Sequence, residues 1–266
     1  MSFDLGPALL FCPADRPERF EKALQRADGV ILDLEDAVAP GRRAIAREAI
    51  AGNPLDPARV VVRVNPSSTG ELAADLEALR STDYRTVMVA KADAALDPIP
   101  GFAIIALCET AAGVLDAPAL ARRDDVVGLM WGAEDLIAST GGSSSRLHGG
   151  AYRAVPDYAR SAVLIAAAAA GKAAIDAVHL DIHDLDGLRA EAEDAVAVGF
   201  SATACIHPSH VPVIREAYLP GEAEVAAARA LLEASIGAGA VFSFEGRMVD
   251  GPVLRHAEAV IRRAGL

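Results

Sequence analysis

The sequence is poor in several features that mark particular classes of protein. It holds only three cysteines, without metal-site spacing, so a disulfide framework is not indicated and a reduced compartment such as the cytoplasm is expected. Basic residues number 25 against 37 acidic ones, a net charge of -12. This balance argues against general binding to nucleic acid or anionic membranes. The longest apolar run, 162–170, is far too short to span a membrane, and residues 1–6 do not resemble a secretory signal.

Glycine-rich nucleotide-binding motifs are also missing: no G-x-G-x-x-G follows the first expected strand, and no G-x-x-x-x-G-K-[ST] occurs. Instead, short apolar runs alternate with helix-like segments. Each run is apolar on both faces, as a parallel strand buried on both sides should be. The runs are 8–12, 30–34, 60–64, 86–90, 103–107, 127–131, 174–180 and 203–206. Eight strand–helix units in a chain of this length predict a (β/α)8 TIM barrel, with a doubly wound open sheet as the alternative.

Charged side chains follow these strands, and V-I-L-D-L-E-D-A-V at 30–38 is the clearest case. Asp33, Glu35 and Asp36 come directly after three apolar residues. Such acids could simply complement the dipole of a following helix. In a barrel, however, the C-terminal ends of the strands carry the catalytic groups, and a ring rich in carboxylates favours a bound cation.

Two further carboxylates suggest which cation. Glu109 and Asp135 follow consecutive expected strands, which would bring them to adjacent positions on the rim. Two carboxylates together with water and substrate oxygens suit Mg²⁺. The competing interpretation places Glu109 in a first helical turn and makes Asp135 a helix cap. A second cluster, H-L-D-I-H at 179–183, would converge if it lay on a strand, but structural or solvated roles are favoured for it.

Several stretches together resemble the HpcH/HpaI aldolase superfamily, in its citrate lyase β-subunit-like branch with malyl-CoA and citramalyl-CoA lyases. They occur in the family's order and cover nearly the whole chain. The stretches are L-F-C-P-A-D-R-P-E-R-F (10–20), V-I-L-D-L-E-D-A-V (30–38), V-R-V-N (62–65), A-L-C-E-T-A-A-G-V (106–114), M-W-G-A-E-D-L (130–136), G-F-S-A-T-A-C-I-H-P-S-H (199–210) and G-R-M-V-D-G-P-V-L (246–254).

The resemblance implies roles for particular residues at the reacting centre. Glu109 and Asp135 would be the magnesium ligands, with Glu35 and Asp36 beside the metal and its waters. Arg63 would contact the reacting carbonyl. Lys91 stands where a Schiff-base lysine could, but metal chemistry makes that role redundant.

The resemblance also implies an acid–base group. Asp250 would be the acid–base group, reaching in from a neighbouring subunit of a homotrimer or hexamer. Independently of the resemblance, Arg16, Arg19 and Lys22 near the end of the first strand are reasonable contacts for CoA phosphates in an acidic protein, although surface arginines are usually just solvated. Substrate contacts are expected at Ile206 and His207, after the last strand. The sequence departs from the family pattern at Ala90, where proline is usual, and at His210, where glutamine is usual.

The expected organisation is a barrel over residues 1–220 and a helical lid over 221–266, with Gly237 and Gly239 as a hinge. The expected function is a Mg²⁺-dependent carbon–carbon lyase. It would cleave a 3-hydroxyacyl-CoA thioester, such as citramalyl-CoA or malyl-CoA, to an acyl-CoA and a keto acid. The alternatives are a citrate lyase β subunit acting on citryl-acyl carrier protein, an aldolase of free keto acids, and a non-catalytic scaffold.

Overall fold

The computed structural model describes residues 5–265 and forms two compact units, Met1–Ile214 and Arg215–Leu266. In the described part of the first unit, eight parallel strands close into a barrel in chain order. They are β1 (Ala8–Pro13), β2 (Gly29–Asp33), β3 (Val60–Val64), β4 (Thr86–Val89), β5 (Ala103–Cys108), β6 (Val126–Trp131), β7 (Ala173–Asp176) and β8 (Ala202–Cys205). Closure is direct, because Leu9 of β1 pairs with Ala204 of β8. The (β/α)8 barrel is confirmed, and the open sheet is excluded.

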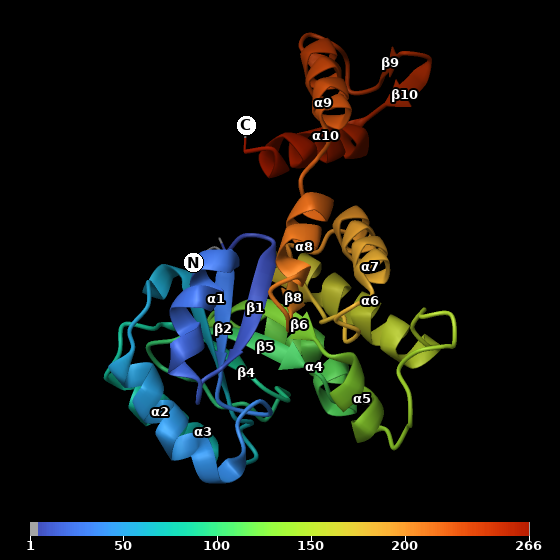
Figure 1. Ribbon diagram of the computed structural model, residues 1–266. Helices are drawn as coiled ribbons and strands as arrows, with labels where there is room; N and C mark the ends of the chain where they lie inside the picture. Colours follow the sequence, from blue (N-terminus) through green and yellow to red (C-terminus); the bar gives the residue numbers. More distant parts are fainter. Residues whose placement is uncertain (1–4, 266) are drawn as a thin grey trace. The chain divides into compact units, whose positions relative to one another are not determined.

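Helices surround the strands on the outside of this unit (Figure 1). They are α1 (Phe20–Arg26), α2 (Arg43–Gly52), α3 (Glu71–Arg80), α4 (Ala111–Ala121), α5 (Ala133–Ser139), α6 (Ala154–Ala169) and α7 (Leu185–Val198). Helix α8 (His210–Tyr218) crosses the boundary between the units. The sequence did not lead us to expect α5, whose single short apolar face gives little helical periodicity.

The barrel interior is filled by side chains from alternate positions of the strands. Leu9, Ile31, Val61, Met88 and Ile105 all belong to this cluster, and each is fully buried. The opposite faces of the same strands are buried too, under the helices, which is why each strand reads as a continuous apolar run. The packed core thus fixes the strand ends in a ring. The positions of the polar residues that follow these ends are therefore fixed as well.

Strand β7 is shorter than the sequence indicated. It ends at Asp176, so residues 179–183 lie on a loop and not on a strand. His179 is buried there, whereas Asp181 and His183 are exposed. The alternation that would have brought all three side chains to one face is therefore absent, and the strand-based geometry for a metal cluster was wrong.

The second unit contains α9 (Glu222–Ser235), a two-stranded antiparallel hairpin of β9 (Phe242–Phe244) and β10 (Arg247–Val249), and α10 (Gly251–Arg263). The hairpin turns at Glu245 and Gly246, both with positive φ, as a two-residue hairpin turn requires. Helices α9 and α10 pack together, and Arg263 is 3.0 Å from Glu224. The hinge role of Gly237 and Gly239 stays a prediction.

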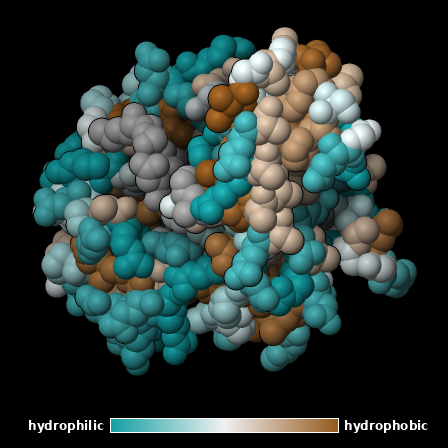
Figure 2. Space-filling view, turned by 90° about the horizontal axis from the view of Figure 1, so that it is seen from above, coloured by the Kyte–Doolittle hydropathy of each residue, from teal (hydrophilic) through white to brown (hydrophobic). Residues whose placement is uncertain are grey.

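No helix within residues 5–265 is long and apolar enough to cross a membrane. Hydrophilic side chains, in teal, cover much of the face in Figure 2, with brown hydrophobic side chains in small groups among them.

Candidate active site

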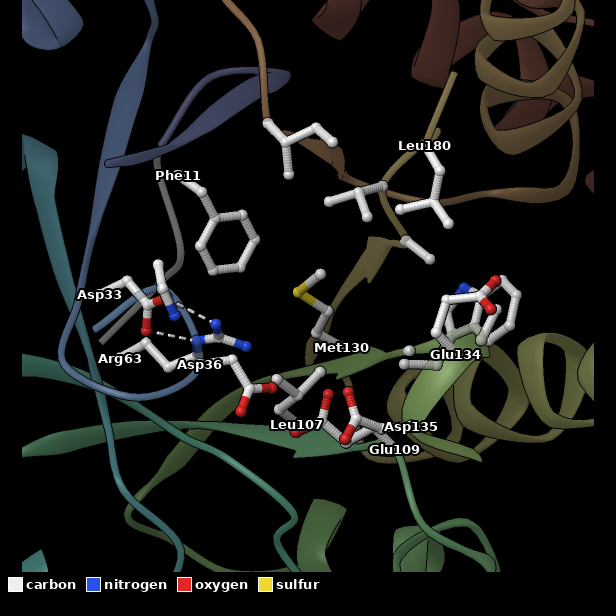
Figure 3. A pocket seen from close by; sticks show the side chains of 17 residues that line it. Phe11, Asp33, Asp36, Arg63, Leu107, Glu109, Met130, Glu134, Asp135 and Leu180 are labelled. Carbon is white, nitrogen blue, oxygen red and sulfur yellow. Dashed lines mark hydrogen bonds and ion pairs between the residues drawn. The ribbon is translucent and has the colours of Figure 1, made fainter. Parts of the chain in front are cut away.

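A cavity of about 350 Å³ opens at the C-terminal ends of the barrel strands. One part of its wall is apolar and includes Phe11, Leu107, Met130, Leu180 and Ile206. The other part carries the charged groups: Asp33, Asp36, Arg63, Glu109, Glu134 and Asp135. In Figure 3 the carboxylates of Glu109 and Asp135 lie next to each other, and Arg63 points into the cavity beside Asp33. Charged and apolar side chains thus line the same cavity.

Arg63 is fixed by three contacts. Its Nε donates to Asp33 Oδ1 at 2.7 Å and its Nη2 to Asp33 Oδ2 at 2.6 Å, and its Nη1 lies 3.3 Å from Glu35 Oε2. The guanidinium also lies over the Phe11 ring, 4.9 Å from the ring centre. Burial opposes the charge, but the hydrogen bonds and charge of Asp33 prevail and raise the pKa of Arg63 above its ordinary value. Arg63 therefore presents a permanent, oriented positive charge.

The carboxylates of the D-L-E-D stretch are held differently from one another. Asp33 accepts the backbone N–H groups of Glu35 and Ala37, which fixes the turn after β2. Glu35 is buried, and that burial raises its pKa although Arg63 and Lys91 pull the other way. Asp36, by contrast, has a side chain that is 56% exposed. The helix-cap interpretation was wrong for these acids, because the next helical turn begins at Pro40 and has Ala39 as its N-cap.

Lys91 occupies the middle of the acidic cluster. Its Nζ lies 2.5 Å from Glu35 Oε1, 3.2 Å from Asp135 Oδ1, 3.6 Å from Asp36 Oδ2 and 4.0 Å from Glu109 Oε1. Burial alone would lower the pKa of Lys91, but the hydrogen bond to Glu35 and the neighbouring acids raise it. A permanently charged amine is a poor nucleophile.

Glu109 and Asp135 come from neighbouring parts of the barrel. Glu109 directly follows β5, and Asp135 lies in the first turn of α5, just after β6. Burial first, and then the charge of Asp135, raise the pKa of Glu109 to about 8. Gly132 makes room for this arrangement, since a Cβ there would stand 3.0 Å from Glu109 Oε2. Two acids forced this close are stabilised by a cation between or beside them.

The donor set fits magnesium and does not fit a metal held wholly by protein. Within residues 5–265 no group of three or more His, Cys, Asp or Glu side chains is arranged as a metal site. Magnesium is usually bound through one or two carboxylates and completes its coordination with water and substrate oxygens. Glu109 and Asp135 would supply those two carboxylates.

A loop after α5 is tied to the site by hydrogen bonds. Ser145 Oγ donates to Glu134 Oε1 at 2.5 Å, next to Asp135. Arg146 pairs with Glu191 of α7, and the same carboxylate binds His179 Nδ1 at 3.0 Å. This loop includes G-G-S-S-S-R at 141–146, and it is anchored at its C-terminal end, which supports the short helix that carries Asp135.

A second cavity, of about 370 Å³, lies at the end of β1 and shares Phe11 and Ile206 with the first. Its wall brings together Arg19, Lys22, Arg26, Ile206 and His207, besides Leu10, Phe11, Cys12, Pro13, Ala23 and Pro208. Arg16 does not line it; its side chain is 53% exposed, 3.8 Å from Asp15. Sequence reasoning missed Arg26, which follows Arg19 and Lys22 at helical spacing.

The remaining residues singled out in the sequence have simple surroundings. Asp250 is the N-cap of α10 and accepts the N–H of Val253 at 3.4 Å.

The three cysteines are free and buried, and burial raises the pKa of Cys12 to about 11 and of Cys108 to about 12. Thiols with such pKa values are not nucleophiles at neutral pH. Sequence reasoning also missed Asp33 as the hydrogen-bond partner of Arg63.

A (β/α)8 barrel with charged groups at the C-terminal ends of its strands is typical of TIM-barrel enzymes. Comparison with known proteins shows the family. The chain belongs to the HpcH/HpaI aldolase/citrate lyase family, whose model matches residues 8–98 and 101–208. It is 56% identical over 262 residues to a citrate lyase subunit beta-like protein of Mycobacterium tuberculosis, covering 98% of this chain and 96% of that one. It is 29% identical to the human mitochondrial citramalyl-CoA lyase, covering 97% and 85%.

A solved structure shows the same likeness. The crystal structure of CitE from Mycobacterium tuberculosis, in complex with magnesium, acetoacetate and coenzyme A, superposes with a TM-score of 0.94 at 55% identity, and 99% of each chain is covered. The family resemblance noted in the sequence is therefore confirmed.

Proposed function

We propose that this protein is a Mg²⁺-dependent carbon–carbon lyase that cleaves a 3-hydroxyacyl-CoA thioester to an acyl-CoA and a keto acid, with citramalyl-CoA or malyl-CoA as the candidate substrates. The observation that carries the proposal is the convergence of Glu109, Asp135 and Arg63 on one cavity. The relatives support the lyase class, since one is a citramalyl-CoA lyase. The solved relative that binds magnesium and coenzyme A supports the cofactor and the thioester.

The reaction requires negative charge to be stabilised at two oxygens, that of the substrate hydroxyl and that of the thioester enolate. As the bond between the α and β carbons breaks, the hydroxyl becomes a carbonyl and the electron pair moves into a thioester enolate. Mg²⁺ bound at Glu109 and Asp135 would orient and polarise oxygens of the keto-acid portion. Arg63, fixed by Asp33, would place N–H donors where negative charge develops. Because Asp33 and Phe11 hold the guanidinium, little reorganisation is required during the reaction.

The two cavities, which share Phe11 and Ile206, suit the two ends of a CoA thioester. The acyl group would occupy the cavity between Arg63 and the apolar wall of Leu107 and Met130. The bound coenzyme would extend from there past Phe11 and Ile206, which line both cavities. Arg19 and Lys22 would then pair with its phosphates, which accounts for a basic cluster in an otherwise acidic protein.

An acid–base group must take the hydroxyl proton and return a proton to the enolate carbon. We assign this role to Asp250 of a neighbouring subunit in a homotrimer, because the family resemblance points to the M-V-D-G-P stretch. Glu35 and Asp36 would lie beside the metal and hold its waters. In the free chain Asp250 caps α10, so its carboxylate already has a defined orientation.

The proposal is tested by incubating the purified protein with Mg²⁺ and a panel of hydroxyacyl thioesters, and measuring keto acid release. The panel contains each enantiomer of citramalyl-CoA and malyl-CoA, the matching free acids, and citryl-acyl carrier protein. Turnover of a CoA thioester alone supports the proposal. Turnover of the carrier-protein thioester alone would make the chain a citrate lyase β subunit. Turnover of free acids would make it an aldolase, and no turnover of any compound would leave a scaffold.

A further inference from the structure

The ammonium of Lys91 lies among the same carboxylates that would bind magnesium. Its Nζ is within 4.0 Å of both Glu109 Oε1 and Asp135 Oδ1, and it makes its shortest contact, 2.5 Å, with Glu35. The Lys91 side chain is 29% exposed, and that of Glu35 only 4%. The pair is therefore largely shielded from solvent. In such a shielded place a charge acts on its neighbours more strongly than it does in water.

The backbone holds Lys91 in this place. Its φ is +51°, in the left-handed region that residues with a Cβ avoid. The residues on either side are tied into the barrel, since Ala90 N–H donates to Val64 O at 3.2 Å and Ala92 N–H to Leu107 O at 3.0 Å. Lys91 N–H itself donates to Glu109 Oε1 at 3.1 Å. An unfavourable conformation kept by three hydrogen bonds indicates that the direction of this side chain matters.

The charges at the site do not balance. Asp33, Glu35, Asp36, Glu109 and Asp135 face Arg63 and Lys91. Arg63 is held by Asp33 and Glu35, which leaves Lys91 as the cation nearest to Glu109 and Asp135 among the described contacts. A divalent ion at these two carboxylates would meet the repulsion of an ammonium only a few ångströms away.

We propose that Lys91 is an internal counter-cation that competes with Mg²⁺ for Glu109 and Asp135. This inference rests on the proposed magnesium site. Without metal, the ammonium holds the acidic cluster together against its own repulsion. When Mg²⁺ binds, the ammonium withdraws toward Glu35 and Asp36. Lys91 thereby weakens metal affinity and lets the site keep its shape whether metal is bound or not, so it is a positioning residue and not a catalytic one.

The test is calorimetric titration of Mg²⁺ into the wild type and Lys91→Met, combined with thermal unfolding in EDTA and in saturating Mg²⁺. Methionine keeps an unbranched side chain and removes the charge. Lys91→Met should bind Mg²⁺ about tenfold or more tightly, because a repelling charge has gone. It should melt below the wild type in EDTA, and the difference should shrink in Mg²⁺. Lys91→Asn, whose residue type tolerates the left-handed region, serves if the methionine variant does not fold.

Two controls separate this effect from others. Lys91→Arg keeps the positive charge and should bind Mg²⁺ closer to the wild-type affinity than Lys91→Met does. Lys172→Met removes a lysine that donates to Arg123 O, outside the cavity, and should leave Mg²⁺ affinity unchanged. Equal or weaker Mg²⁺ binding by both Lys91→Met and Lys91→Asn would overturn the inference while the metal site stands. No Mg²⁺ binding by the wild type would overturn the metal site, and the inference with it.

Discussion

Asp33 and Arg63 are direct neighbours in the barrel: they are register partners on β2 and β3, and their side chains join through two hydrogen bonds of 2.7 and 2.6 Å. The pair is almost wholly buried, with side-chain exposures of 1% and 11%. A guanidinium held at two points cannot rotate away from the cavity. The remaining donors of Arg63 are therefore positioned before substrate arrives, and that is the condition for electrostatic catalysis.

Replacing Arg63 with lysine keeps the charge and removes the rigid fork. We expect Arg63→Lys to lower kcat about 100-fold, the loss typical of an oxyanion donor, with a smaller change in KM. Steady-state kinetics on the best thioester of the panel measure both constants. Arg59→Lys is the matched control, since Arg59 donates to backbone carbonyls of Asp28 and Leu24, which precede β2 in the chain. A change confined to KM would make Arg63 a substrate anchor.

Neutralising either carboxylate of the proposed metal site should abolish magnesium binding. We expect Glu109→Gln and Asp135→Asn to give no calorimetric Mg²⁺ signal and to lose cleavage activity, while circular dichroism stays that of the wild type. The reason is that Mg²⁺ is usually held through only one or two carboxylates, so each of the two proposed ligands matters. Glu77→Gln, an exposed acid on α3, is the control. Full activity in both site variants would remove the metal assignment.

The basic cavity beside β1 predicts an effect on coenzyme binding alone. Arg19→Ala and Lys22→Ala should each weaken CoA binding about 5- to 10-fold, more at low than at high salt, because phosphate pairs are screened. Titration of CoA by calorimetry checks this, with Arg80→Ala on α3 as the control. Unchanged affinity in both variants would place the coenzyme elsewhere.

If Asp250 acts in a neighbouring subunit, two inactive variants should rescue each other. Asp250→Asn alone and Glu109→Gln alone should be nearly inactive. Mixing them under conditions that let subunits exchange creates sites with Glu109 from one chain and Asp250 from another, so activity should partly return. Asn can still cap a helix, so α10 should be retained. No recovery after proven exchange, or a monomer by light scattering, would contradict action between subunits.

His179 predicts how stability depends on pH. Its hydrogen bond to Glu191 raises its pKa, against burial, and Asp184 adds to the rise while Arg146 opposes it. A pKa raised by folding means that the stabilisation is fully present below the unfolded value of about 6.5 and is lost as pH rises through the folded value. The ring of His210 also faces the His179 ring, and the two ring centres are 6.4 Å apart.

We therefore expect the loss of unfolding free energy in His179→Gln to be largest below the unfolded pKa of about 6.5 and to shrink as the pH rises above it. Urea denaturation across this range measures it, and His256→Gln on α10 is the control. A loss that did not change with pH would show that the histidine acts only by packing.

The sequence predicted the barrel well because each strand is apolar on both faces, a pattern typical of parallel strands covered by helices. It also indicated Glu109 and Asp135, since residues after parallel strands share one edge. It could not show the Asp33–Arg63 pair or the place of Lys91, because side-chain partners depend on three-dimensional register. The expected seventh strand was too long for a similar reason. V-H-L-D-I-H at 178–183 alternates as a strand does, but the strand ends at Asp176, whose carboxylate accepts from Trp131 and Arg160.

The most direct test of the account is the metal dependence of thioester cleavage. Citramalyl-CoA and malyl-CoA are incubated with the protein after EDTA treatment, then after Mg²⁺ is restored, and acetyl-CoA and keto acid are quantified together by mass spectrometry. We predict no cleavage in EDTA, recovery with Mg²⁺, equimolar products, and no recovery in Glu109→Gln. Cleavage that persists without divalent metal, or free CoA appearing in place of acetyl-CoA, would contradict it.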